Sequence, residues 1–171
     1  MPKFVVHIGP HKTGTTYLQS CFLALSHEMQ SSGVLYSTDW QADRGPGHAD
    51  LARRIRTGRD IVLETEFASL SKSAYETILI SAENLSPLAP AHIQYLKNLI
   101  GDQQTQIVFY IRRPAELLFS TWQEGVKHGS ITMHTKMVCS LMYFQPTIAI
   151  YFVCTNLLAY IRMKYFCATA W

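Results

Sequence analysis

The hydrophobic pattern of the chain alternates short apolar runs with segments of helical periodicity. The runs at Lys3–Ile8, Thr77–Ser81 and 106–111 are short, rich in β-branched residues and bounded by turn residues, as buried strands are. A shorter run at 34–36 is a possible further strand. Helical periodicity predicts helices over residues 15–32, 48–56, 61–73, 91–100 and 114–128. Strands that alternate with helices predict an α/β fold: a three-layer parallel sheet with helices on both faces.

Composition narrows the class of protein. The chain has 48% hydrophobic and 16% charged residues, which predicts a packed domain rather than a disordered chain. The net charge of +3 fits a small anionic ligand, and the lack of a lysine or arginine run argues against a nucleic-acid partner. The first apolar run is too short for a signal peptide, and no disulfide framework is evident, so we expect a cytoplasmic protein.

The strand at Lys3–Ile8 is followed by a loop that has the features of an anion-binding site. Such a loop directs backbone N–H groups and a helix N-terminus at one point, where a negative charge is stabilised. Gly14 allows close backbone approach, Lys12 adds a positive charge, and Thr13, Thr15 and Thr16 add hydroxyl donors. The alternative is an ordinary tight turn between a strand and a helix.

The order of residues in this loop differs from the common ATP-binding loop. That motif places lysine directly after its last glycine, followed by serine or threonine. Here Lys12 precedes Gly14 by two residues, and the chain has no Gly-Lys pair in the loop. The sequence therefore predicts a phosphate or sulfate bound without an obligatory metal ion.

The loop resembles the 5′-phosphosulfate loop of sulfotransferases that use 3′-phosphoadenosine 5′-phosphosulfate, in the form common among bacterial members. The resemblance implies a P-loop NTPase-like fold and a cofactor-binding loop made of His11, Lys12, Thr13, Gly14, Thr15 and Thr16. It also implies that Lys12 neutralises charge on the bridging oxygen as the sulfuryl group leaves. Residues 1–130 are then a sulfotransferase-like nucleotide-binding domain.

A second motif follows the last apolar run. Arg112 lies at a strand end, where its planar guanidinium suits a phosphate, and Pro114 begins a helix that carries Ser120. The segment resembles the family's 3′-phosphate motif, which implies that Arg112 and Ser120 bind that phosphate. The sequence leaves the role of Arg113 open. The alternative is a proline-started helix preceded by two solvent-exposed arginines.

Sulfuryl transfer to an alcohol or amine requires a group that accepts a proton. Glu83 follows the strand at Thr77–Ser81, so it is expected at the sheet edge where ligands bind in open α/β folds. The resemblance allows a glutamate in this role without fixing it; a purely structural acid is the alternative. His48 is a weaker candidate. The predicted acceptor is a small molecule or carbohydrate of unspecified identity.

Residues 131–171 differ in composition from the rest. Every aspartate and glutamate lies at or before Glu124, whereas the last residues are rich in aromatic and aliphatic side chains. Three interpretations stand: an out-of-frame sequence, a membrane-associated segment at 137–161, which is less favoured, or ordinary core. The family resemblance ends near residue 130, so we expect an incomplete fold.

The sequence leaves two alternatives to sulfuryl transfer: a truncated, inactive fragment with weak nucleotide binding, or a nucleotide-dependent kinase.

Overall fold

The computed structural model describes residues 1–42 and 45–129. The tail at 131–171, with its apolar stretch at 137–161, lies outside the described residues, so its three interpretations stay predictions. Across the two described ranges, no helix combines the length and apolar character needed to cross a membrane.

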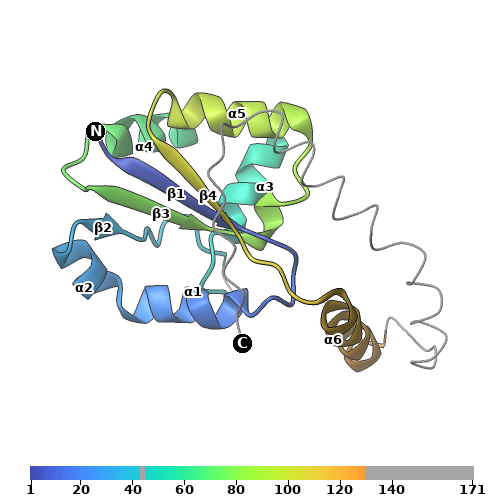
Figure 1. Ribbon diagram of the computed structural model, residues 1–171. Helices are drawn as coiled ribbons and strands as arrows, with labels where there is room; N and C mark the ends of the chain where they lie inside the picture. The colour runs from blue at the N-terminus through green and yellow to red at the C-terminus, as the bar shows by residue number, and fades with distance from the viewer. Residues whose placement is uncertain (43–44, 130–171) are drawn as a thin grey trace.

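The described strands form one parallel sheet in the order β2-β3-β1-β4 (Figure 1). Its strands are β1 (Lys3–Ile8), β2 (Val34–Leu35), β3 (Thr77–Ser81) and β4 (Thr105–Phe109). β1 lies in the middle and pairs with β3 on one side and β4 on the other. The predicted strand at 106–111 ends earlier, at Phe109, because its last partner is Ile8, where β1 also ends.

Helices cover both faces of this sheet. Figure 1 shows α1 (Thr15–Ala24) and α2 (Ser26–Ser31) on one side, and α3 (Ala49–Thr57), α4 (Ile61–Ser71) and α5 (Pro90–Ile100) on the other. α6 (Pro114–Lys127) lies beyond the sheet, next to the loop that follows β1. The predicted α/β class with a three-layer parallel sheet is therefore confirmed.

The predicted single helix over residues 15–32 is wrong, because the structure divides it into α1 and α2. Leu25 ends the first helix and begins the second, with φ −98° and ψ 13°. α2 has no buried residue, so no burial of an apolar face holds it in line with α1.

The hydrophobic core lies between the sheet and α3, α4 and α5. Alternate side chains of β1 and β3 point to this layer, as the two-residue period of a strand requires. The principal core residues come from these strands and from the three helices: Phe4, Val6, Ile8, Ile78, Ile80, Leu51, Ile55, Leu63, Phe67, Ile93 and Ile100. This packing fixes β1 and β3 and hence the loops at their carboxyl ends.

The loops after β1, β3 and β4 converge at one edge of the sheet. The Ser86 hydroxyl donates to the Gly9 carbonyl and accepts from the Gly9 N–H, each at 2.8 Å, which ties the chain after β3 to the start of the first loop. A Cβ at Gly9 would lie 3.0 Å from the carbonyl oxygen of Tyr110, so only glycine allows this approach to the chain after β4.

A buried polar cluster supports the same edge from the α1 side. Ser81 Oγ lies 2.7 Å from His7 Nδ1 and accepts a hydrogen bond from Gln19 Nε2 at 3.1 Å. The backbone N–H of Ser81 donates to His48 Nδ1 at 3.1 Å, and His48 Nε2 lies 2.8 Å from the Ser37 carbonyl oxygen. His48 therefore carries its proton on Nε2 and is neutral, since Nδ1 must accept.

This cluster predicts acid sensitivity. Burial lowers the pKa of both His7 and His48 to about 4, below the value of about 6.5 for an exposed histidine. Between those values the unfolded chain binds more protons, so the free energy of unfolding falls as pH drops from about 6.5 to about 4. We expect urea unfolding to show a loss on the order of 2–3 kcal/mol per histidine at the lower pH. The exposed His27, replaced by glutamine, is the control and should leave the pH dependence unchanged.

Candidate functional site

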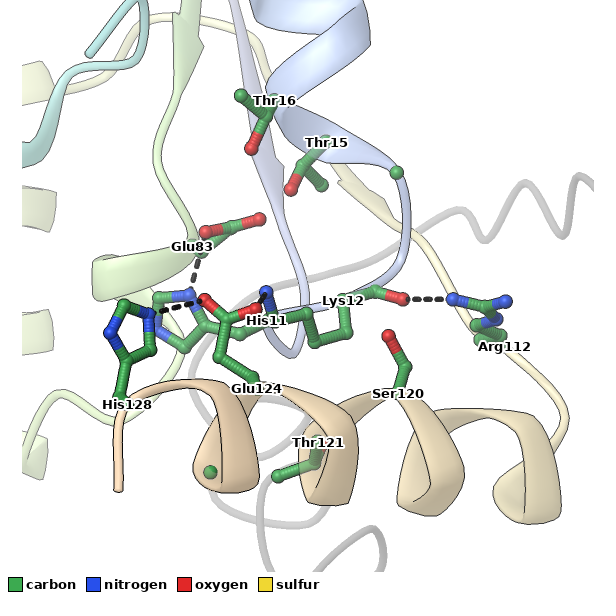
Figure 2. A pocket seen from close by; sticks show the side chains of 12 residues that line it. His11, Lys12, Thr15, Thr16, Glu83, Arg112, Ser120, Thr121, Glu124 and His128 are labelled. Carbon is green, nitrogen blue, oxygen red and sulfur yellow. Dashed lines mark hydrogen bonds and ion pairs between the residues drawn. The ribbon is translucent and has the colours of Figure 1, made fainter. Parts of the chain in front are cut away.

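A cavity of about 730 Å³ opens at the edge of the sheet where the loops converge (Figure 2). Its walls come from the loop after β1, the start of α1, the short 3₁₀ helix η1 (Glu83–Leu85) and α6. The lining residues are His11, Lys12, Gly14, Thr15, Thr16, Glu83, Arg112, Ser120, Thr121, Glu124, Gly125 and His128. Residues predicted from two separate motifs thus line one cavity.

The loop between β1 and α1 leaves the N-terminus of α1 open to this cavity. Lys12 has φ 71° and Gly14 has φ 86°, both in the left-handed region, and Gly14 is the N-cap of α1. No side chain caps this helix, whereas Asp60 caps α4 by accepting from the Leu63 N–H at 3.0 Å. The first N–H groups of α1 therefore lack a side-chain acceptor and, with the helix dipole, favour an anion.

Thr15 gives independent support for a ligand at this point. Its side chain is buried, with 1% of the residue exposed, and its hydroxyl has no hydrogen-bond partner. A buried hydroxyl without a partner costs free energy, which a ligand acceptor would recover. Figure 2 shows the hydroxyls of Thr15 and Thr16 pointing into the cavity. Thr13 does not line it; its hydroxyl donates to the Pro10 carbonyl at 3.0 Å, within the loop.

Lys12 extends across the cavity and forms an ion pair with Glu124 of α6 (Figure 2). This pairing lowers the pKa of the Glu124 carboxyl, chiefly through the hydrogen bond from Lys12. The sequence motifs did not indicate Glu124 as a site residue. The signal was present, because Glu124 lies four residues after Ser120 and so shares its helix face.

Arg112 connects the two motifs directly. Its Nη1 donates to the carbonyl oxygen of Lys12 at 2.9 Å, and its Nε donates to Glu116 at 3.3 Å. Ser120 lines the cavity, with its hydroxyl directed from α6 toward the loop (Figure 2). Arg113 has a side chain that is 83% exposed, lies 3.8 Å from Glu116 and is not a lining residue. Arg112, rather than Arg113, therefore faces the cavity.

Figure 2 shows Glu83 at the end of the cavity opposite Arg112, where it pairs with His11. The distance from Glu83 Oε2 to His11 Nδ1 is 2.7 Å, and the Glu83 side chain is only 17% exposed. Glu83 is placed there because β3 is parallel to β1, so η1 follows its carboxyl end beside the first loop. His48 is unsuited to the role of base, since it is fully buried and both ring nitrogens are engaged.

The fold is thus a parallel α/β fold, and Lys12, Arg112 and the N-terminus of α1 border one cavity at the carboxyl edge of its sheet. Among the described residues, no group of three or more His, Cys, Asp or Glu side chains is arranged to hold a metal ion.

Comparisons with known proteins leave the family open. No family model matches the chain, and no curated protein matches it. Among solved structures, it is similar to a gluconokinase from Sinorhizobium meliloti 1021, with 14% sequence identity and a TM-score of 0.39. The match covers 99% of this chain and 84% of the gluconokinase chain. At this identity and score, the similarity carries no argument about activity.

Proposed function

We propose that this chain is a sulfotransferase that transfers a sulfuryl group from 3′-phosphoadenosine 5′-phosphosulfate to a hydroxyl or amine acceptor. The observation that carries the proposal is the shared cavity: Lys12 of the first motif and Arg112 of the second line the same space. One nucleotide that carries anionic groups at its 5′ and 3′ positions can therefore meet both residues.

The residues around the first loop suit the 5′-phosphosulfate. The uncapped N-terminus of α1 and the unpartnered Thr15 hydroxyl supply donors, and Lys12 supplies charge. The 3′-phosphate is assigned to Arg112 and Ser120, which line the same cavity. His11 and Thr16 are proposed as further contacts, whereas Thr13 would act by shaping the loop through its bond to Pro10.

The proposed chemical step uses a proton acceptor and a cation. The acceptor oxygen forms a bond to sulfur while the bond from sulfur to the bridging oxygen breaks. The electron pair of the broken bond stays on the 5′-phosphate, where Lys12 and the α1 N–H groups stabilise it. The acceptor's proton passes to the Glu83 carboxylate, which His11 holds in place.

Two rival functions remain part of the test. A nucleotide-dependent kinase would transfer phosphate from ATP with magnesium, and an inactive fragment would bind the nucleotide without turnover. We also propose a cytoplasmic location and no nucleic-acid partner. The test is incubation of the full chain with 3′-phosphoadenosine 5′-phosphosulfate and a mixture of small alcohols, amines and sugars. Release of adenosine 3′,5′-bisphosphate that depends on acceptor, and that Glu83→Gln abolishes, supports the proposal; ATP turnover without it refutes the proposal.

Thr15 offers a prediction that separates binding from stability. Thr15→Val keeps the side-chain shape and removes a buried hydroxyl that has no protein partner. The free energy of unfolding should stay equal or rise by up to about 1 kcal/mol, because no protein hydrogen bond is lost. The affinity for adenosine 3′,5′-bisphosphate should fall about tenfold, the value of one hydrogen bond to a charged group. Calorimetry and urea unfolding measure the two; unchanged affinity would remove Thr15 from the site.

Removing the charge of Glu124 is expected to strengthen ligand binding, whereas removing the Thr15 hydroxyl weakens it. Its carboxylate occupies Lys12 and adds negative charge to a cavity proposed to hold an anion. Glu124→Gln should therefore tighten adenosine 3′,5′-bisphosphate binding several-fold, because the anion no longer competes with the carboxylate for Lys12. Glu28→Gln, on the exposed surface of α2, is the matched control. Weaker binding by the Glu124 variant would mean that the ion pair positions Lys12 rather than opposes the ligand.

A further inference from the structure

A second, smaller cavity of about 210 Å³ adjoins the proposed donor cavity. The two cavities share three lining residues: His11, Thr16 and Glu83. Glu83 therefore borders both spaces, with its carboxylate held by His11 at 2.7 Å. Any group in the smaller cavity lies next to the one carboxylate assigned as proton acceptor.

The walls of the smaller cavity are held in place by packing. Gly47 is buried against Gln19: a Cβ at Gly47 would lie 2.6 Å from the Gln19 amide atoms. Gln19 is itself buried and donates to Ser81 Oγ at 3.1 Å. Another wall is Asn84 of η1, whose backbone carbonyl accepts from Arg56 at 2.7 Å. The cavity thus has walls from α1, from the segment before α3 and from η1.

The chemistry of these walls favours a neutral, polar ligand. The polar residues that line it are Thr16, Gln19 and Asn84, beside the His11–Glu83 pair. Among the described residues that line it, no lysine or arginine is present to pair with an anion, and the Glu83 carboxylate would repel one. His11 is the only aromatic ring among these described lining residues, and it is engaged by Glu83, so a phenol would find little stacking surface.

The volume also restricts the ligand. A space of about 210 Å³ is smaller than the roughly 300–1,000 Å³ of pockets for drug-sized ligands. It corresponds to about seven water molecules at liquid density. A single sugar ring or a similar small polyol unit is of this order, while a large hydrophobic acceptor is not.

We propose that the smaller cavity is the acceptor site and that it selects an uncharged aliphatic hydroxyl, such as that of a neutral sugar, over a phenol or an anionic sugar. This assignment rests on the proposed sulfuryl transfer, since it takes Glu83 as the group that receives the acceptor's proton. It narrows the acceptor class, which the sequence leaves open.

The test uses the full chain loaded with adenosine 3′,5′-bisphosphate and three probes observed by ligand-detected NMR. The probes are methyl β-D-glucopyranoside, methyl β-D-glucopyranosiduronate and phenol, which differ in charge and aromaticity. We expect the neutral glycoside to bind at least about tenfold more tightly than the other two, a difference of about 1.4 kcal/mol. Asn84→Leu should abolish glycoside binding, while Asn98→Leu, on the exposed face of α5, should leave it unchanged.

The outcomes separate this inference from the proposed function. If the bisphosphate binds but the glycoside does not, or if Asn84→Leu leaves glycoside binding unchanged, the acceptor assignment is overturned and the donor site stands. If the bisphosphate itself does not bind, the proposed function fails. Gly45→Leu is a second blocking variant in case Asn84→Leu unfolds. Gly45 lines the cavity, and the fold has room for a side chain there because a Cβ at Gly45 meets nothing within 4 Å. Preference for phenol or for the uronate would also overturn the inference.

Discussion

Replacing Lys12 by methionine is expected to weaken adenosine 3′,5′-bisphosphate binding by about 10- to 150-fold, the value of a hydrogen bond to a charged group. Methionine matches the four-atom apolar part of the lysine side chain and lacks the ammonium that extends into the cavity. The loss of kcat/KM should be larger, about 10²- to 10³-fold, because charge on the bridging oxygen develops in the transition state. Calorimetry and a bisphosphate-release assay measure the two effects.

Lys127→Met is the matched control for this substitution. Lys127 is exposed at the end of α6 and does not line the cavity. The Lys127→Met variant should therefore bind the bisphosphate as tightly as the unmodified chain does. Stability should change little in the Lys12 variant, since its partner Glu124 has a side chain 45% exposed to solvent. Equal affinities for the Lys12 and Lys127 variants would contradict the assignment of Lys12.

Arg112→Ala is expected to have the second-largest effect, and the effect should depend on the ligand. Arg112 is assigned to the 3′-phosphate, so the affinity for adenosine 3′,5′-bisphosphate should fall by about 10- to 150-fold. Adenosine 5′-monophosphate lacks that phosphate, and its affinity should fall by about fivefold, because Arg112 also donates to the Lys12 carbonyl at 2.9 Å. Titrating both nucleotides into both proteins measures the difference.

Arg113→Ala provides the control, because that side chain is 83% exposed and lies outside the cavity. It should leave both affinities unchanged. An equal loss for the two nucleotides in the Arg112 variant would show that Arg112 supports the loop rather than contacts a 3′-phosphate.

The strands and the first loop were predictable because the local sequence pattern, short apolar runs that end at turn residues, agrees with the fold. Lys3–Ile8 and Thr77–Ser81 match the predicted strand bounds, since short β-branched runs between turn residues leave few alternatives. Residues of both motifs line one cavity because each motif follows a strand of a parallel sheet, and the carboxyl ends of parallel strands share one edge. The break at Leu25 was not predictable, because the periodicity of apolar residues continues through it.

The side-chain partners inside the site depend on tertiary structure and were not predicted. The Lys12–Glu124 pair joins residues more than a hundred positions apart, and it exists because α6 lies across the loop after β1. The pairing of His11 with Glu83 likewise depends on η1 lying beside that loop. Thr13 and Thr15 carry the same hydroxyl group, but the Thr13 hydroxyl bonds to the Pro10 carbonyl and the Thr15 hydroxyl has no protein partner. The backbone conformation of the folded loop makes this difference.

The most direct test of the donor site is a pair of calorimetric titrations of the full chain, one with adenosine 3′,5′-bisphosphate and one with ATP. Each is run with magnesium and with a chelator. If Lys12 and Arg112 hold the 5′- and 3′-phosphates of one nucleotide, the bisphosphate binds more tightly than ATP, and the chelator leaves its affinity unchanged. Tighter binding of ATP, and only with magnesium, would contradict this account and favour a kinase.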